Sequence, residues 1–274
     1  MIAELKGENR IELFRRVAQK LVSEITEYKN VEGIMFMGGL ARGFTDKFSD
    51  LDMTVLLGKR DERLKTQIRE LSELEMRRSV IDIDLEIHVL EDFKKRKWNE
   101  TDRWDFSHGE IVFDLNGKIR KMFEAKLKMP KDFWIRRIAA CSEYMKWYCC
   151  PPKDDVGTIA EAWIDRGDLT AAHDSLNYAV ELFFEAIFAL NKEFLPPPKW
   201  RIHYSYKLKW LPEKYKELLE EMVISKSLTT EDFDRRLEAI RKAWSTVLPK
   251  IQHETGLTPS QTTKYYVEKI LQQS

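Results

Sequence analysis

The hydrophobic pattern of this 274-residue chain changes near Pro130, and that change limits the possible folds more than any other feature of the sequence. Before Pro130, short apolar stretches with strand spacing alternate with amphipathic helical stretches; after it, strand patterns stop and helical spacing continues to the end. The sequence therefore predicts an α+β fold, in which an N-terminal mixed β-sheet flanked by helices precedes an all-helical C-terminal domain. We place the domains at 1–128 and 129–274.

The clearest strand pattern is the segment VIDIDLEIHVL, residues 80–90. Its apolar residues alternate with Asp82, Asp84, Glu86 and His88, so one face of the strand is apolar and the other is polar. Further strands are predicted within 31–37, 50–57 and 109–119, the last with a turn at Asn116-Gly117. Helices are predicted over 9–29, which Asn9 can cap, and over 61–78, 131–149, 169–192, 213–225, 231–247 and 259–272.

Charge and composition exclude several classes of protein. The 46 basic and 46 acidic residues balance, which argues against a nucleic-acid partner unless a basic patch is local. Acidic residues interrupt the longest apolar runs, so no membrane span is expected. The N-terminus lacks the apolar core of a signal peptide, and the three cysteines show no metal or disulfide spacing. These features predict a soluble, cytoplasmic protein with buried, reduced cysteines.

Asp50 and Asp52 open the predicted strand 50–57. Residues two apart on a strand point to the same face, roughly 6.6 Å apart, so the two carboxylates would repel each other unless a cation lies beside them. Mg²⁺ is the natural cation, because it takes one or two carboxylates together with substrate phosphates. By itself the pattern also fits a turn cap followed by a solvated edge residue.

Gly38-Gly39 make the metal hypothesis stronger. They follow the predicted strand 31–37, and glycine lets backbone N–H groups approach a phosphate in a tight turn. Arg42 lies in the short helix expected next and could reach a phosphate oxygen. Carboxylates that follow one another on the polar face of 80–90 also need compensation, so we expect Asp84 or Glu86 to join the two aspartates.

In the helical half, His173 and Asn177 lie one turn apart on a predicted helix, either as a polar face or as part of a substrate site. Lys199 and Trp200 follow three prolines, which stiffen the loop before them. Lys199 could pair with a triphosphate, whereas Trp200 is better explained by packing between helices.

The stretch GGLARGFTDKFSDLD, residues 38–52, resembles the motif of the polymerase-β-like nucleotidyltransferase superfamily. Gly38-Gly39, Ala41-Arg42-Gly43 and Ser49-Asp50-Leu51-Asp52 match that motif, and the strand 80–90 fits the one that supplies the third acid. Residues 166–200 are similar, more loosely, to a long helix and proline loop of the aminoglycoside and lincosamide nucleotidyltransferases. Gly39 departs from the pattern, which often has a serine there whose hydroxyl holds a phosphate oxygen.

The resemblance implies an ATP- and Mg²⁺-dependent enzyme with a catalytic domain at 1–128 and a helical substrate-binding domain at 129–274. Asp50, Asp52 and Asp84 would hold the metal, and the nucleotide-binding residues would be Gly38, Gly39, Arg42, Ser49 and Lys199. Glu86 would be the general base, with Asp84 as the second choice. AMP would pass to a hydroxyl of a small acceptor, for which an aminoglycoside-like antibiotic is one candidate.

Two other hypotheses stay open at this point. One is an AMP-transferase of the toxin–antitoxin type that modifies a protein or an RNA, against which the long helical half argues. The other is a catalytically inactive nucleotide-binding protein, against which the intact acids argue. Some relatives share a site between two subunits, so a homodimer is also possible.

Overall fold

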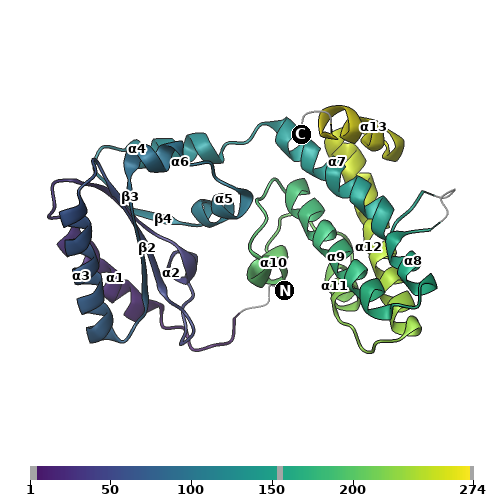
Figure 1. Ribbon diagram of the computed structural model, residues 1–274, viewed down its shortest axis with the longest axis horizontal. Coiled ribbons are helices and arrows are strands. Elements are labelled where there is room, and N and C mark those ends of the chain that lie inside the picture. Colours follow the sequence, from purple (N-terminus) through teal and green to yellow (C-terminus); the bar gives the residue numbers. More distant parts are fainter. Residues whose placement is uncertain (1–4, 153–156, 272–274) are drawn as a thin grey trace. The chain divides into compact units, whose positions relative to one another are not determined.

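The computed structural model describes residues 5–152 and 157–271, which form two compact units (Figure 1). Lys128 is the last residue of the first unit, and Met129 is the first of the second. The first unit contains a mixed four-stranded sheet with helices, and the described part of the second contains helices without a strand. The predicted α+β fold class is therefore confirmed.

The sheet has the strand order β3-β2-β1-β4. Its strands are β1 (Val31–Phe36), β2 (Leu51–Leu57), β3 (Ile83–Val89) and β4 (Glu110–Asp114). β1 is antiparallel to both of its neighbours, and β2 is parallel to β3. α3 (Glu62–Ser79) connects the parallel pair, and its N-cap Asp61 accepts a hydrogen bond of 2.9 Å from the Leu64 N–H.

One face of the sheet is covered by α1 (Ile11–Ile25) and α3 (Figure 1). The apolar residues of β3 lie on this face, as the alternating pattern predicts. β3 starts later than predicted, because Val80 adopts a left-handed backbone, with φ of 59°, at the end of α3. α1 also starts later, at Ile11, and the predicted capping residue Asn9 accepts the Ile11 N–H from just outside the helix.

A second, largely aromatic core is formed by α4 (Leu90–Lys95), α5 (Glu100–Ser107), α6 (Lys118–Leu127) and the loops between them. Trp98 is at its centre, with its ring centroid 4.4 Å from that of Phe106 and 5.1 Å from that of Phe123. These rings therefore pack within the first unit. Asn116-Gly117 does make a turn, but Gly117 begins α6 and does not lead into a second strand.

The second unit is built around α9 (Leu169–Leu190), whose residues are mostly buried. The other helices are α7 (Lys131–Tyr148), α8 (Ile159–Asp165), α10 (Pro198–Ser205), α11 (Tyr215–Val223), α12 (Thr230–Thr255) and α13 (Pro259–Lys269). α7, α8, α11 and α12 pack against α9, and α13 packs against α7. Residue 272, the last of the predicted helix 259–272, lies outside the described residues.

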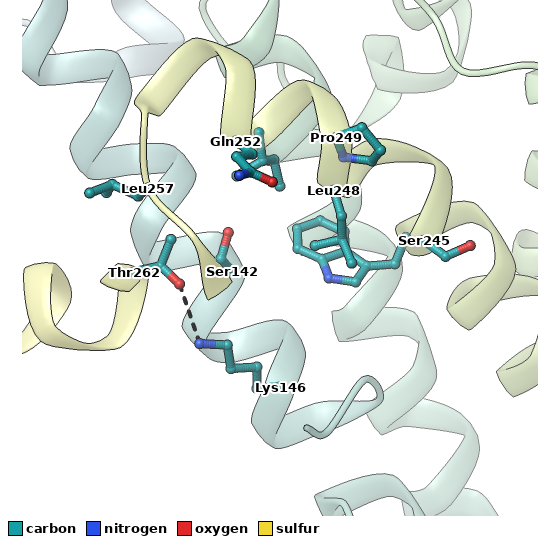
Figure 2. Close-up of a pocket in the computed structure, with 10 residues that line it drawn as sticks. Ser142, Lys146, Ser245, Leu248, Pro249, Gln252, Leu257 and Thr262 are labelled. Carbon is teal, nitrogen blue, oxygen red and sulfur yellow. Dashed lines mark hydrogen bonds between the residues drawn. The ribbon is translucent and has the colours of Figure 1, made fainter. Parts of the chain in front are cut away.

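α12 continues eight residues beyond its predicted end and passes through Pro249. Pro249 removes one helical hydrogen bond. Ile251, two residues later, is nevertheless buried, so the apolar face of α12 stays packed on the other helices of the second unit. A cavity of about 230 Å³ lies beside the proline, between α7, α12 and the start of α13 (Figure 2). At its polar end Lys146 donates to Thr262 at 3.3 Å and to Glu143 at 2.6 Å.

A buried polar cluster joins α9 to α12. The Arg236 side chain is almost fully buried and donates to the Met222 carbonyl at 3.0 Å and to Asn177 Oδ1 at 2.6 Å. Its third nitrogen lies 3.1 Å from His173 Nδ1. His173 and Asn177 do share one helix face, as predicted, and the structure shows that this face binds Arg236 within the second unit.

The cysteines are free: Cys141 and Cys149 are buried, and Cys150 is half-buried. Burial raises the pKa of all three thiols, that of Cys150 to about 12, which makes them inert near neutral pH. In the stretches 5–152 and 157–271, every helix is too short or too polar to cross a membrane.

Candidate functional site

The turn at Gly38-Gly39 is the first part of the site. β1 ends at Phe36, and the Met37 N–H donates to the Asp52 carbonyl at 3.0 Å, which fixes the turn to β2. Gly38 has a left-handed φ of +57°, and a Cβ atom there would lie 1.6 Å from Asp52 Oδ2. A Cβ atom on Gly39 would lie 2.6 Å from the Phe44 carbonyl oxygen. Both positions therefore require glycine in this backbone.

α2 (Gly38–Arg42) begins at this turn. The first N–H groups of a helix have no acceptor within the helix, so those at Gly38 and Gly39 are available in principle to a ligand. The absence of side chains at both residues lets Asp52 Oδ2 and the Phe44 carbonyl oxygen pack directly on the backbone of the turn.

The strand register brings the acids together. Asp52 pairs with Asp84 across the parallel strands, and Thr54 pairs with Glu86. Because side chains on paired strands alternate in step, Asp52, Asp84 and Glu86 share the face opposite to the α1–α3 core. Asp84 is thus the predicted acid directly alongside Asp52, and Glu86 lies two residues farther along β3.

Asp50 has a different setting from the one predicted. β2 begins at Leu51, so Asp50 precedes the strand and the two-residue alternation does not decide its direction. The Leu51 N–H donates to the Asp82 carbonyl at 2.8 Å, which keeps Asp50 next to the start of β3. Its side chain is exposed.

The donor set fits a hard divalent cation. Asp52 and Asp84 are paired carboxylates on neighbouring strands, an arrangement that repels without a compensating charge. Oxygen donors of this kind suit Mg²⁺. Over the described residues, no three His, Cys, Asp or Glu side chains are already gathered around one point as metal ligands. The set Asp50, Asp52 and Asp84 therefore stays a prediction.

Glu86 has a neighbour that orients it. Its Oε2 lies 2.9 Å from His88 Nε2, and the His88 ring lies 5.3 Å from that of Phe93 in the aromatic core. The imidazole thus connects the exposed carboxylate to a buried ring.

Arg42, at the end of α2, is largely buried, and its guanidinium group contacts α5. Its Nη1 lies 3.5 Å from Asp105 Oδ1, and its guanidinium carbon lies 5.1 Å from the centre of the Trp104 ring. This pair holds α2 against α5. The contact of Arg42 with Asp105 and Trp104 has no signal in the sequence, because no spacing rule relates residues more than 60 positions apart.

Ser49 closes the loop between α2 and β2. Its hydroxyl accepts the Asp46 N–H at 3.0 Å and donates to Asp46 Oδ1 at 3.1 Å. Asn9 fixes the other side of this loop through the Gly43 carbonyl and the Thr45 N–H. Asn9 was predicted only as a helix cap, and this tertiary role has no signal in the sequence.

Lys199 lies in the second unit, on α10, where its side chain is exposed. Trp200 beside it is half-buried, with its ring 5.9 Å from that of Tyr204. Both rings lie on α10, so the packing of Trp200 between helices stays a prediction.

Comparisons with solved structures give likenesses of shape at low identity. A nucleotidyltransferase-like protein from Exiguobacterium sibiricum superposes with a TM-score of 0.43 and 11% identity over 87% of this chain and 77% of that one. A mutant of the toxin–antitoxin MntA-HpeT gives a TM-score of 0.32 and 15% identity over 48% of this chain and 97% of that one. The tri-AMPylated Shewanella oneidensis HEPN toxin in complex with MNT antitoxin gives 0.30 and 14%, over 49% and 98%. No protein-family model and no curated protein sequence matches this chain.

Proposed function

We propose that the first unit is an Mg²⁺-dependent nucleotidyltransferase that moves AMP from ATP to a hydroxyl of a small acceptor. The second unit would bind that acceptor. The observation that carries the proposal is the contact between Gly38 and Asp52. The Asp52 carboxylate packs on a turn that requires glycine, and Asp52 pairs with Asp84 on the neighbouring strand. A phosphate-approaching turn and a pair of carboxylates thus meet at one end of the sheet.

The chain's own residues would hold the nucleotide as follows. Backbone N–H groups at Gly38 and Gly39 would donate to phosphate oxygens, which glycine permits at close range. Arg42, through Asp105, would keep α2 in place, and any direct contact with phosphate would add to this role. Ser49 would keep the loop before Asp50 closed. Lys199 would pair with the triphosphate as a point charge.

Asp50, Asp52 and Asp84 would hold Mg²⁺. When bound, the ion neutralises charge on the phosphate oxygens and orients the triphosphate. Without it, Asp52 and Asp84 would repel an incoming polyphosphate, so nucleotide binding should depend on the metal.

Glu86 would act as the general base. The register places it on the same face as Asp84 but farther along β3, which separates a proton-accepting carboxylate from the metal-binding ones. Glu86 would take the proton of the acceptor hydroxyl while the hydroxyl oxygen forms a bond to the α-phosphorus. The bond from that phosphorus to the β-phosphate bridging oxygen breaks, and pyrophosphate leaves. Asp84 is the alternative base.

Titration calorimetry with a non-hydrolysable ATP analogue, with and without Mg²⁺, tests the binding step. We expect Mg²⁺-dependent binding that Asp52→Asn abolishes, while Asp82→Asn, an exposed acid of the loop before β3, leaves it intact. No binding by the wild-type chain, or equal binding by Asp52→Asn, would reject the proposal.

Mass spectrometry after incubation with ATP tests transfer. The acceptor panel would contain hydroxylated antibiotics, a protein and an RNA, so a gain of one AMP would also separate the small-acceptor hypothesis from the macromolecular ones. Binding of the analogue without any transfer would support a nucleotide-binding protein and would contradict the proposed enzyme.

A further inference from the structure

Basic and aromatic residues are concentrated in residues 199–216 of the second unit. This segment contains six Lys or Arg residues and one acidic residue, whereas the charges of the whole chain balance. Its aromatic rings are interleaved with the charges: Trp200, His203, Tyr204, Tyr206, Trp210 and Tyr215. This segment therefore has a local excess of positive charge that the overall composition hides.

The charges of the segment are accessible. The side chains of Lys199, Lys207, Lys209 and Lys214 are all exposed. Arg201 is instead ion-paired with Glu181, and Lys216 lies 3.9 Å from Glu220, so these two contribute less to the local field. Four exposed lysines within 16 residues are a local concentration of positive charge, which attracts polyanions.

Two rings of the segment lie beside a lysine, Tyr204 beside Lys207 of the segment and Trp210 beside Lys250 of α12. Lys207 Nζ lies 4.3 Å from the centre of the Tyr204 ring, and the Trp210 ring lies 5.8 Å from Lys250 Nζ. Tyr204, Tyr206 and Trp210 are half-buried, so each keeps an accessible portion. Burial, and then Lys207, lower the pKa of His203, which leaves its imidazole neutral at pH 7 and able to stack.

The backbone that carries these side chains is anchored to α9. Asn191, which follows that helix, makes two hydrogen bonds to the backbone of Trp210, at 2.8 and 2.9 Å. Arg201 Nε donates to the Pro196 carbonyl at 2.9 Å, which fixes the start of α10. The surface is thus held in place before any partner binds, which lowers the entropic cost of association.

We infer that residues 199–216 bind single-stranded nucleic acid, with the exposed lysines on the phosphates and Tyr204, Tyr206 or Trp210 stacked on bases. Surfaces that bind single strands combine positive charge with aromatic rings in this way, whereas a duplex buries the base faces that such rings need. An anionic membrane would satisfy the charges but would leave the rings without their stacking partners. This inference concerns binding without ATP, and the variants that test it leave Lys199 of the proposed nucleotide site unchanged.

The test is fluorescence anisotropy of a labelled oligouridylate of about 12 nucleotides, a length within the usual site size. The first variant is Lys207→Gln, Lys209→Gln and Lys214→Gln together, in the full chain. Its matched control replaces three exposed lysines elsewhere in the unit, Lys131, Lys242 and Lys264, by Gln. Each lysine on a phosphate contributes about 0.7 to the salt slope of a single strand, so the first variant should lower the slope by about 2 and the affinity on the order of 100-fold near 0.1 M salt.

A second pair of variants tests stacking. Trp210→Leu should weaken binding roughly tenfold with an unchanged salt slope. Trp147→Leu, which removes a half-exposed indole from α7, should have no effect. Equal losses in the matched controls, or no binding of the oligonucleotide by the wild-type chain, would overturn the inference. So would equally tight binding of inorganic polyphosphate or of phosphatidylserine vesicles, since either would show that the rings contribute nothing.

Discussion

Asp52 Oδ2 lies 1.6 Å from the position that a Cβ atom on Gly38 would occupy, so the carboxylate packs directly on the glycine backbone. The two residues are far apart on the chain but belong to adjoining strand ends, because the Met37 N–H donates to the Asp52 carbonyl. The position of the carboxylate therefore depends on the absence of a side chain at Gly38, which leads to the first prediction.

Gly38→Ala should displace the Asp52 carboxylate and weaken Mg²⁺-dependent binding of an ATP analogue by at least about tenfold, or about 1.4 kcal/mol. Gly43→Ala is the matched control, since Gly43 also has a positive φ but open space around it. That control should lose about 1–2 kcal/mol of unfolding free energy from backbone strain and retain its affinity. Calorimetry and urea unfolding measure the two quantities, and unchanged affinity in Gly38→Ala would contradict the argument.

Gly39→Ser introduces the serine often found at this position of the motif that residues 38–52 resemble, but it should not improve nucleotide binding. The added Cβ would lie 2.6 Å from the Phe44 carbonyl oxygen, so the loop after α2 must move. We expect a loss of about 1–3 kcal/mol in unfolding free energy, as in other overpacked sites. Gly58→Ser, whose Cβ would meet only the Glu32 side chain and Asn30 at 3.2 Å or more, should be much better tolerated. Tighter nucleotide binding by Gly39→Ser would show that this loop adapts freely.

Glu86→Gln and Asp84→Asn should separate chemistry from binding. Glu86→Gln should keep the affinity for the ATP analogue and slow AMP transfer by about a hundredfold to ten-thousandfold, as expected for loss of a general base. Asp84→Asn should weaken the Mg²⁺-dependent binding itself, because Asp84 lies alongside Asp52. Single-turnover rates and calorimetry distinguish the two effects. If the two variants exchange these phenotypes, Asp84 is the base.

Arg236→Leu should destabilise the second unit by about 2–4 kcal/mol, because it leaves the buried Met222 carbonyl and His173 without their donor. Arg166→Leu, at an exposed arginine, should change the unfolding free energy by no more than about 0.5 kcal/mol. Urea unfolding followed by circular dichroism measures both variants. A similar loss in the two would mean that the buried cluster contributes little.

Lowering the pH should reduce the unfolding free energy of the second unit, because the ionised Asp232 carboxylate stabilises it. Burial alone raises the pKa of this carboxyl, but hydrogen bonds from Arg235, from the Lys226 and Ser227 N–H groups and from Ser225 lower it well below its usual range. A depressed pKa stabilises the fold above the unfolded value of about 3.9, and this contribution is lost as the pH falls below about 4. The difference in unfolding free energy between the wild-type chain and Asp232→Asn should therefore shrink between about pH 5 and pH 3. A constant difference over that range would contradict this role.

The elements that sequence analysis located best are those with long periodic patterns. The alternation in 80–90 identified β3 and its apolar face, and the repeats near α3, α7 and α9 located those helices. Short elements were missed: α4, α5 and α6 are held by their contribution to the aromatic core around Trp98, not by a period of their own. The end of α12 was placed too early, because the local penalty of Pro249 is smaller than the packing of Ile251 beyond it.

For the candidate site, the sequence identified the residues but not which of them lie side by side. The residue types and spacing of Gly38-Gly39, Asp50, Asp52, Asp84 and Glu86 were apparent from the sequence, because each lies at the end or on the polar face of a recognisable strand. Which acid lies beside Asp52 was not, since a strand pattern carries no information about register across a long crossover. The pairing of Asp52 with Asp84, the pairing of Arg42 with Asp105 and the loop contacts of Asn9 are all long-range contacts.

By itself, the sequence determined that this chain has a mixed α+β part followed by a helical part, and which residues could carry chemistry. Those conclusions follow from local periodicity and residue type, which act over a few positions. Only the tertiary structure decided that Gly38 packs on Asp52, that Gly39 cannot be exchanged for serine without moving the loop at Phe44, and that Arg42 is held by α5. The contacts of Gly38 and Arg42 join segments that are separated in the sequence, and that of Gly39 depends on the conformation of the loop after α2. All three form only once the sheet and its helices are packed together.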